Sequence, residues 1–161
     1  MIVLATTLAG CGGGGFQPLY ATGANGERPD ARLAGLDISP IPGRVGQRIR
    51  NELVFERSVG GEVQKPTKRL EIKLTESVLT SLVQRDGDST GQTYQVEAVY
   101  RIVDTTTNKP EYEGRTIARA NFERFSAIYS NVRAREDAEN RAARNISSDI
   151  KTRLAVHLSR S

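Results

Sequence analysis

In the stretch Thr93–Asp104, TYQVEAVYRIVD, apolar side chains recur at every second position. The side chains that share this parity are Tyr94, Val96, Ala98, Tyr100 and Ile102. Alternation with a period of two is typical of a β-strand that buries one face and leaves the other in water. We therefore expect a half-buried strand here, with these residues in the core.

Two further stretches show the same alternation. Lys68–Thr75, KRLEIKLT, places apolar residues at alternate positions, and Gly114–Phe125 does so more weakly. The alternation slips near Ser77, where we expect a β-bulge. Clusters of turn-forming residues at 85–91 and 105–110 separate the three stretches. Consecutive strands joined by short turns predict an antiparallel meander.

The remaining segments predict one edge strand and two helices. Leu36–Ile41 alternates, and Pro40 confines this strand to a sheet edge because proline donates no backbone hydrogen bond. Helical spacing of apolar residues predicts helices over Arg44–Arg57 and Asn131–Ser159. The predicted fold is an α/β two-layer sandwich of the α+β class, in the order β-α-β-β-β-α, with a mainly antiparallel four-stranded sheet and both helices on one face. The polar residues expected on the other sheet face are Arg69, Glu71, Lys73, Gln95, Glu97 and Arg101.

The composition is that of one folded domain with excess positive charge. The chain has 161 residues, of which 37% are hydrophobic and 26% charged. The formal net charge of +4 favours anionic partners. The single cysteine excludes a disulfide within the chain and any paired-cysteine metal or redox site.

The pattern of ionisable residues favours a binding protein over an enzyme. The single histidine, His157, lies near the end of the last predicted helix, and no nucleophile or metal-binding motif accompanies it. Strand carboxylates such as Glu71 and Glu97 alternate with Arg or Lys, as on a solvated sheet face. We expect no catalytic residue and no metal site.

The stretch Leu8–Cys11, LAGC, follows a short apolar run and resembles the lipobox at which bacterial lipoprotein signal peptides are cleaved. No Lys or Arg precedes the run, so we expect the segment to be only part of a signal peptide. The alternative is a buried strand in which Cys11 is a small hydrophobic residue. Gly10–Gly15 also matches a dinucleotide-binding glycine pattern, but Pro18 blocks the helix that this pattern requires.

The lipobox divides the chain into three parts. We expect residues 1–10 to be the remnant of a lipoprotein signal peptide, 11–35 a lipidated flexible tether, and 36–161 the folded domain. Cys11 would carry a diacylglycerol and an N-acyl chain, since several chains are needed for stable anchoring. We expect no other cofactor. Gly12, rather than Asp, follows the cysteine and favours the outer membrane.

Three stretches resemble the alphaproteobacterial branch of the LPS-assembly lipoprotein LptE family. They are Phe16–Tyr20 (FQPLY), Ile41–Leu53 (IPGRVGQRIRNEL) and Tyr129–Ala143 (YSNVRAREDAENRAA). The resemblance covers nearly all of the chain after Cys11 and includes the predicted order of elements. Two departures, the extra glycines after the cysteine and Gln17 where Arg is frequent, lie in the expected tether.

The resemblance implies a lipoprotein on the periplasmic side of the outer membrane that sits inside the LPS-assembly β-barrel protein LptD. It would plug that barrel, aid its assembly, and assist insertion of lipopolysaccharide into the outer leaflet. The basic residues that best suit lipid A phosphates are Arg85, Arg101 and Lys109. At each of them an ordinary solubilising surface charge is the alternative.

Two other functions fit parts of the sequence. A different envelope accessory lipoprotein, such as a secretin pilot or an auxiliary subunit of a lipid transporter, would share the lipobox and differ in its partner. A nucleic-acid-binding module would suit the positive charge, but such sheets stack bases on exposed aromatic side chains. Tyr94 and Tyr100 share the face of Val96 and are expected to be buried, so we expect no nucleic-acid partner.

Overall fold

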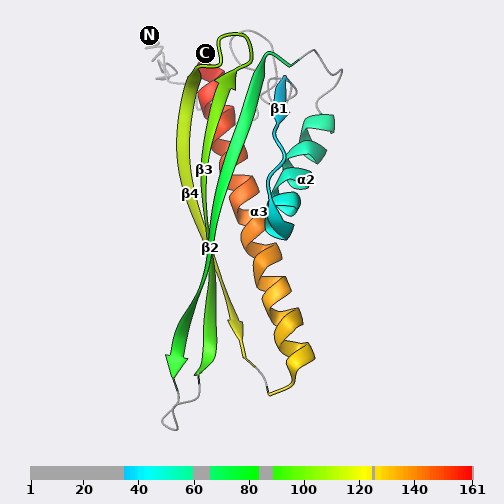
Figure 1. Cartoon of the computed structure of the whole chain (residues 1–161), viewed down its shortest axis with the longest axis vertical. Coiled ribbons are helices and arrows are strands. Elements are labelled where there is room, and N and C mark those ends of the chain that lie inside the picture. Colours follow the sequence, from blue (N-terminus) through cyan, green and yellow to red (C-terminus); the bar gives the residue numbers. More distant parts are fainter. Residues whose placement is uncertain (1–34, 60–65, 84–88, 125, 161) are drawn as a thin grey trace, which may run out of the picture.

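The computed structural model describes residues 35–59, 66–83, 89–124 and 126–160. Its elements follow the predicted order β-α-β-β-β-α (Figure 1). They are β1 (Leu36–Ile38), α2 (Gly43–Val59), β2 (Lys68–Val83), β3 (Ser89–Asp104), β4 (Pro110–Glu123) and α3 (Ile128–Arg160). The predicted signal peptide, most of the predicted tether, and Cys11 lie outside the described residues.

The strands form one sheet in the order β1-β2-β3-β4. Strands β2, β3 and β4 are antiparallel neighbours, as the meander predicts, and β1 runs parallel to β2. Pairing of β1 covers only the start of β2 and stops where Ile38 lies opposite Leu70. A final backbone bond joins the Ser39 amide to the Leu70 carbonyl at 3.0 Å. Pro40 follows directly and ends the pairing, since it has no N–H to donate.

One sheet face, which we call the inner face, is covered by the helices. All the β3 residues predicted for the core are buried, each at most 1% exposed. Helix α3 lies over β3 and β4, and α2 lies against α3 and β1. Small residues of α3, Ala138, Ala142 and Ala143, are fully buried and bring its first half close to the sheet. Larger residues, Ile146 and Ile150, fill the space further along.

The outer face carries the charged and polar side chains that the alternation predicts. Arg69, Glu71, Gln95, Glu97 and Arg101 make polar contacts with one another or with β4 on this face. Such cross-strand pairs contribute modestly to sheet stability. The predicted assignment of the two sheet faces is therefore confirmed.

The bulge predicted near Ser77 is absent from the described part of β2. Pairing with β3 continues in register from Lys68 to Thr80, and the irregularity falls between Thr80 and Leu82. The prediction was wrong because it took two adjacent apolar residues, Val78 and Leu79, as a break in the alternation. Both are exposed, at 39% and 50%, so ordinary alternation continues without a change of face.

Glycine at one position of β4 is required by a close approach. A Cβ atom on Gly114 would lie 2.4 Å from Cζ of the Tyr100 ring. The ring of this buried tyrosine therefore occupies the space that a side chain on β4 would need.

The sheet and α3 extend together past the start of α2. Figure 1 shows β2 and α3 diverging toward the end of the molecule that holds the last residues of β2 and the start of α3, here called the distal end. Helix α2 begins at Gly43 and runs away from it. The inner face near the distal end is consequently covered less completely than the centre of the sheet.

Candidate functional site

Arg101, a candidate for phosphate contact, lies on the outer face in the middle of an ion-paired row. Its Nη2 atom lies 2.7 Å from Oε2 of Glu71, and Arg69 Nε lies 3.0 Å from the other carboxylate oxygen. The Arg101 guanidinium, through its hydrogen bond, lowers the pKa of Glu71 below its ordinary value despite the opposing effect of partial burial. Arg101 keeps half of its side chain in solvent and remains accessible to an anion.

Lys109, the second candidate, is exposed at the end of a tight turn between β3 and β4. One carboxylate oxygen of Asp104 accepts hydrogen bonds from the backbone amides of Thr106 and Thr107, at 2.8 and 2.7 Å. These bonds lower the pKa of Asp104. Asn108 adopts a positive φ of 53°, which Asn tolerates well. The turn thus holds Lys109 outward on a well-ordered backbone.

The structure describes two of the three basic residues singled out from the sequence, Arg101 and Lys109. Arg101 and Lys109 both lie near the β3–β4 turn, whereas the β2–β3 connection is at the opposite end of β3. Arg85 belongs to that connection and lies outside the described residues, as does Cys11.

The structure instead brings several arginines together beside β4. A groove between β4 and α3 is lined by Arg115, Arg119, Arg153 and Asp149, among others. Arg115 pairs with Glu97 at 2.7 Å, and Arg153 pairs with Asp149 at 2.9 Å. The Nε of Arg119 donates to the neutral Gln95 side chain at 2.6 Å, so its positive charge is not neutralised by that partner. The groove has a net positive character.

This groove was not found from the sequence. Arg115 and Arg119 are four residues apart in a predicted strand, so their side chains lie on the same face. This spacing could have indicated that the two arginines lie close together. The contribution of Arg153 depends on the rotation of α3 about its axis, and the drift of a four-residue repeat along a helix obscures that rotation.

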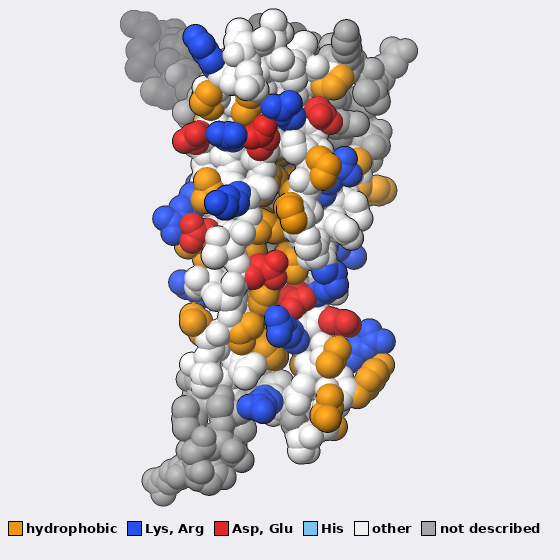
Figure 2. All heavy atoms as spheres, in the orientation of Figure 1, with side chains coloured by type: hydrophobic (Ala, Val, Ile, Leu, Met, Phe, Trp, Pro, Cys, Tyr) orange, Lys and Arg blue, Asp and Glu red, His pale blue; other side chains and the backbone are white. Residues whose placement is uncertain are grey.

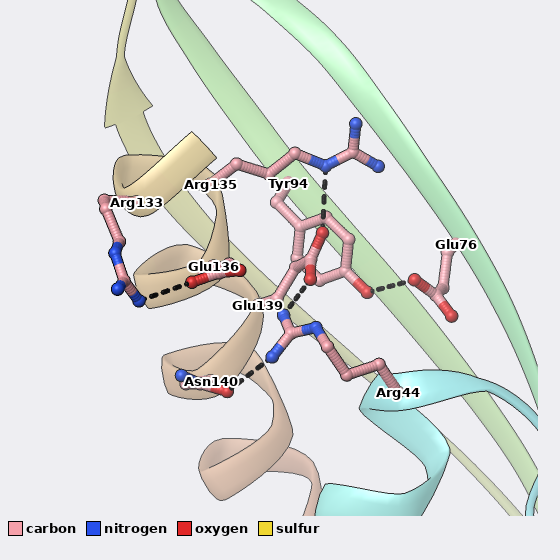
Figure 3. Close-up of polar contacts among 8 residues, drawn as sticks. All are labelled: Arg44, Glu76, Tyr94, Arg133, Arg135, Glu136, Glu139 and Asn140. Atoms are coloured by element: carbon pink, nitrogen blue, oxygen red, sulfur yellow. Dashed lines mark hydrogen bonds and ion pairs between the residues drawn. The ribbon is translucent and has the colours of Figure 1, made fainter. Parts of the chain in front are cut away.

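A second polar cluster joins the two helices on the inner side (Figure 3). Glu139 of α3 is buried and pairs with Arg44 at the start of α2. Its other oxygen accepts a hydrogen bond from Arg135 Nε at 2.9 Å. Arg44 also donates to the Asn140 side chain at 3.2 Å. One buried carboxylate therefore holds an arginine from each helix and fixes the start of α2 against α3.

The same region contains a hydrogen bond between the core and the sheet edge. The Tyr94 ring is buried at 1% exposure, yet its hydroxyl donates to Oε2 of Glu76 on β2 at 2.7 Å. Burial, with help from the Glu76 carboxylate, raises the pKa of Tyr94 well above its ordinary value. Tyr94 therefore acts here as a neutral donor.

Apolar side chains are exposed at the start of α3. Ile128, Tyr129 and Val132 are 82%, 70% and 50% exposed, and Figure 2 shows hydrophobic side chains gathered at this distal corner. Arg133 lies over the Tyr129 ring, with its guanidinium carbon 5.4 Å from the ring centre. An apolar group flanked by a cation is typical of a surface that meets a partner.

These surfaces suit binding. Among the described residues, no three His, Cys, Asp or Glu side chains lie close enough together to hold a metal ion. The acidic residues of the outer face and the interhelical cluster are mostly engaged by arginines. Neither described helix combines the length and apolarity that crossing a bilayer requires.

Solved structures share this fold. A predicted lipoprotein from Caulobacter crescentus superposes with a TM-score of 0.63 at 20% identity, covering 81% of this chain and 95% of its own. The rare lipoprotein B from Shewanella oneidensis superposes with a TM-score of 0.52 at 12% identity, and the match covers 76% of this chain and 97% of that protein. A minor lipoprotein from Acinetobacter baumannii superposes with a TM-score of 0.53 at 7% identity, and the match covers 76% of this chain and 90% of that protein.

At these identities the likeness establishes the fold. No protein-family model matches the chain, and no curated protein matches it either.

Proposed function

We propose that this protein is a lipoprotein of the bacterial envelope, acylated on Cys11, that complexes with and plugs the LPS-assembly β-barrel LptD. In that complex it aids assembly of the barrel and insertion of lipopolysaccharide into the outer leaflet. The observation that carries the proposal is the agreement of two independent features. The fold is shared with several lipoproteins, and Leu8–Cys11 resembles a lipobox.

The surface chemistry is compatible with a position inside a barrel. The lumen of a large outer-membrane barrel is polar, so a protein that fills it needs a charged and hydrogen-bonding exterior. The outer face supplies alternating Arg and Glu side chains on β2, β3 and β4. A narrow body built of one sheet and two helices suits an elongated lumen.

Anion recognition would use arginine and lysine side chains that retain exposure. Arg101 and Lys109 lie near one end of the sheet, and the β4–α3 groove adds Arg119. Guanidinium groups bind phosphates through paired, charge-assisted hydrogen bonds. We assign lipid A phosphates to these residues, with Arg85 as a further candidate on the β2–β3 connection.

Labelling of growing cells with radioactive palmitate tests the lipid anchor. The wild-type protein should incorporate label, and Cys11→Ser should lose it. Label retained in Cys11→Ser, or absent from the wild type, contradicts the anchor.

Purification from solubilised membranes tests the partner. The LPS-assembly barrel should be recovered in stoichiometric amount with the tagged protein. Recovery of a secretin or a lipid-transporter complex in its place would contradict the barrel assignment while leaving the lipoprotein assignment intact.

Binding of purified lipopolysaccharide tests the phosphate contacts. Arg101→Gln and Lys109→Gln should each weaken binding, by about tenfold for loss of one charge-assisted contact. Arg48→Gln on α2, whose ion pair with Glu52 is also exposed, is the matched control and should bind normally.

A further inference from the structure

The β4–α3 groove is elongated. One of its walls is the run of β4 from Arg115 to Arg119, and the other is a row of α3 side chains, Asn145, Asp149 and Arg153. Four steps along a strand cover about 14 Å and eight residues of helix rise about 12 Å, so the two walls match in length. With a volume of about 600 Å³, the groove has room for an extended segment of about five residues.

The β4 backbone faces into this groove. The Asn121 carbonyl points away from β3, because it accepts a hydrogen bond from Arg141 of α3 at 2.8 Å. The side on which a strand residue presents its N–H and C=O alternates along the chain, and the β3–β4 register is unbroken here. Arg115, Ile117 and Arg119 therefore present backbone groups to the groove. A bound polypeptide could hydrogen-bond to these groups.

Arg119 carries a positive charge that the protein does not neutralise. Its Nε donates to the neutral Gln95 side chain at 2.6 Å, and no carboxylate of the described residues pairs with it. Its two terminal nitrogens remain available to an anion, and a guanidinium binds a carboxylate through two parallel hydrogen bonds.

Two further arginines lie at the other end of the groove. Strand β4 and helix α3 run in opposite directions, so the Arg153 end of the helical row faces the Arg115 end of the strand wall. Arg115 pairs with Glu97 and Arg153 with Asp149, yet the two arginine side chains stay 63% and 49% exposed. Such exposed pairs contribute little to stability, so either guanidinium can also engage a second carboxylate.

An apolar side chain separates the two basic ends. Ile117 lies midway between Arg115 and Arg119 on the same face of β4 and is 43% exposed. The groove thus offers a cation, an apolar contact and a second basic end at equal steps of two strand residues.

We propose that the β4–α3 groove binds an extended acidic segment of a partner protein. One carboxylate of the segment meets Arg119, an apolar side chain two residues further covers Ile117, and a second carboxylate meets the end formed by Arg115 and Arg153. The pattern acid–x–apolar–x–acid reads the same in both directions, so it does not depend on the direction of the segment. Beside Asp149 the segment carries Ser or Thr, because a third carboxylate there would be repelled.

Other occupants match the groove less well. A single phosphate group would meet only one of the two basic ends, and it would leave Ile117 uncovered. A second copy of the chain brings a net charge of +4 and is disfavoured by repulsion. Residues 1–34 of the chain have no net charge to offer, since their ionisable side chains are Glu27, Arg28, Asp30 and Arg32.

The proposal goes beyond the function proposed above and depends on neither lipidation nor lipopolysaccharide. Of the residues assigned to lipid A phosphates, the groove contains only Arg119. Arg101→Gln and Lys109→Gln should therefore weaken lipopolysaccharide binding and leave the affinity for an acidic peptide unchanged. The two proposals can consequently fail separately.

The experiment uses two libraries of nine-residue peptides, tested against the 161-residue chain. Both carry Val, Ile or Leu at position five, Ser or Thr at positions four and six, and Gly or Ser at the four outer positions. One library has Asp or Glu at positions three and seven, and the other has Lys there. Fluorescence anisotropy should find binders in the acidic library and none in the lysine library.

Gln95→Glu is the sharpest test of the site. The new carboxylate has nearly the shape of the glutamine and would pair with Arg119, as Glu97 pairs with Arg115. It should weaken binding of the acidic peptide about tenfold, and Arg119→Gln should do the same. Gln47→Glu, an equal change of charge at an exposed position of α2, is the matched control and should leave the affinity unchanged.

Asp149→Asn should act in the opposite direction. It removes the carboxylate that engages Arg153 and should strengthen binding of the acidic peptide severalfold. A gain of affinity is a result that general damage to the fold would not produce.

The proposal is overturned if the acidic library contains no binder, if the lysine library binds equally well, or if Gln95→Glu and Gln47→Glu weaken binding to the same extent. Vesicles containing phosphatidylglycerol are the second probe. Vesicle binding that Gln95→Glu weakens, in the absence of any peptide binding, would place a lipid phosphate in the groove and overturn the proposal. Dimerisation of the chain that Gln95→Glu abolishes would also overturn it, because a second copy would then be the occupant.

Discussion

Tyr94 on β3 and Glu76 on β2 are joined by a hydrogen bond of 2.7 Å that links a fully buried ring to an exposed edge carboxylate. Their strands place Tyr94 opposite Val78 and Glu76 opposite Val96, so the contact is diagonal across the sheet. The bond ties the inner face of β3 to β2 near the start of α2.

Tyr94→Phe should lower the free energy of unfolding by about 1 kcal/mol. The substitution keeps the buried ring and removes one hydrogen bond to a largely solvated carboxylate. Urea denaturation followed by circular dichroism gives the value. Tyr94→Ala, which also empties the ring site, should cost about 3–5 kcal/mol. Equal stability of Tyr94→Phe and the wild type would contradict the bond.

Alkaline pH should destabilise the wild type more than Tyr94→Phe. The pKa of Tyr94 is raised in the folded state from its ordinary value of 10.0, chiefly by burial. Above that ordinary value the unfolded chain releases the phenolic proton while the folded chain keeps it. The contribution of Tyr94 to the free energy of unfolding is therefore fully present below pH 10 and decreases as the pH rises further. Parallel stability curves for the two proteins would contradict this.

Tyr100→Phe should be neutral or slightly stabilising, in contrast to Tyr94→Phe. Among the described residues, no hydrogen bond of ordinary geometry reaches the buried Tyr100 hydroxyl, although burial and the neighbouring Tyr112 side chain raise its pKa. Removing an unsatisfied polar atom relieves its desolvation cost while the ring packing is preserved. The two tyrosines lie on the same face of the same strand, so each serves as the control for the other. A loss above about 1 kcal/mol would indicate a partner for Tyr100.

Arg44 and Glu139 should show a coupling energy of about 1 kcal/mol in a double-mutant cycle with Arg44→Met and Glu139→Gln. The Glu139 carboxylate is mostly buried, whereas Arg44 keeps half of its side chain in water, which limits the value. The exposed α3 pair of Arg153 and Asp149 is the control and should give at most about 0.5 kcal/mol. Equal coupling in the two cycles would contradict the interhelical role.

Arg101→Gln should raise the pKa of Glu71 toward its ordinary value of 4.5. The Arg101 guanidinium is the largest influence that holds this pKa down, and Arg69 acts in the same direction. Carboxyl carbon shifts recorded by NMR during an acid titration give the midpoint. Lys73→Gln, a change of equal charge on the same face, should leave the midpoint almost unchanged.

The fold was predictable because β3 alternates without interruption. The alternation showed which set of alternate residues is buried. The neighbouring alternating stretches, joined to it by short turns, then predicted a meander. The position of the irregularity in β2 was not predictable in this way. Alternation fixes the phase only where one face is buried, and Val78 and Leu79 are both exposed.

The candidate surfaces were only partly predictable. Placement of Arg101 on the outer face follows from strand parity, and placement of Lys109 follows from the turn signal before β4. The groove between β4 and α3 and the cluster around Glu139 each depend on where helices or strands stop relative to one another. Such lengths of overlap arise from packing between distant segments, which local patterns do not encode.

The helix that covers the sheet follows all of its strands in the chain. The β2–β3 and β3–β4 hairpins can each form as soon as both of their strands have left the ribosome, since their contacts are local in the sequence. The inner face of the sheet, which includes Tyr94 and Tyr100, must nevertheless remain exposed to water until α3 has been synthesised. Only then can Ile146 and Ile150 pack against it. Folding of this protein is therefore completed late in its synthesis, and a chain halted before α3 would expose the apolar face of its sheet and be prone to aggregate.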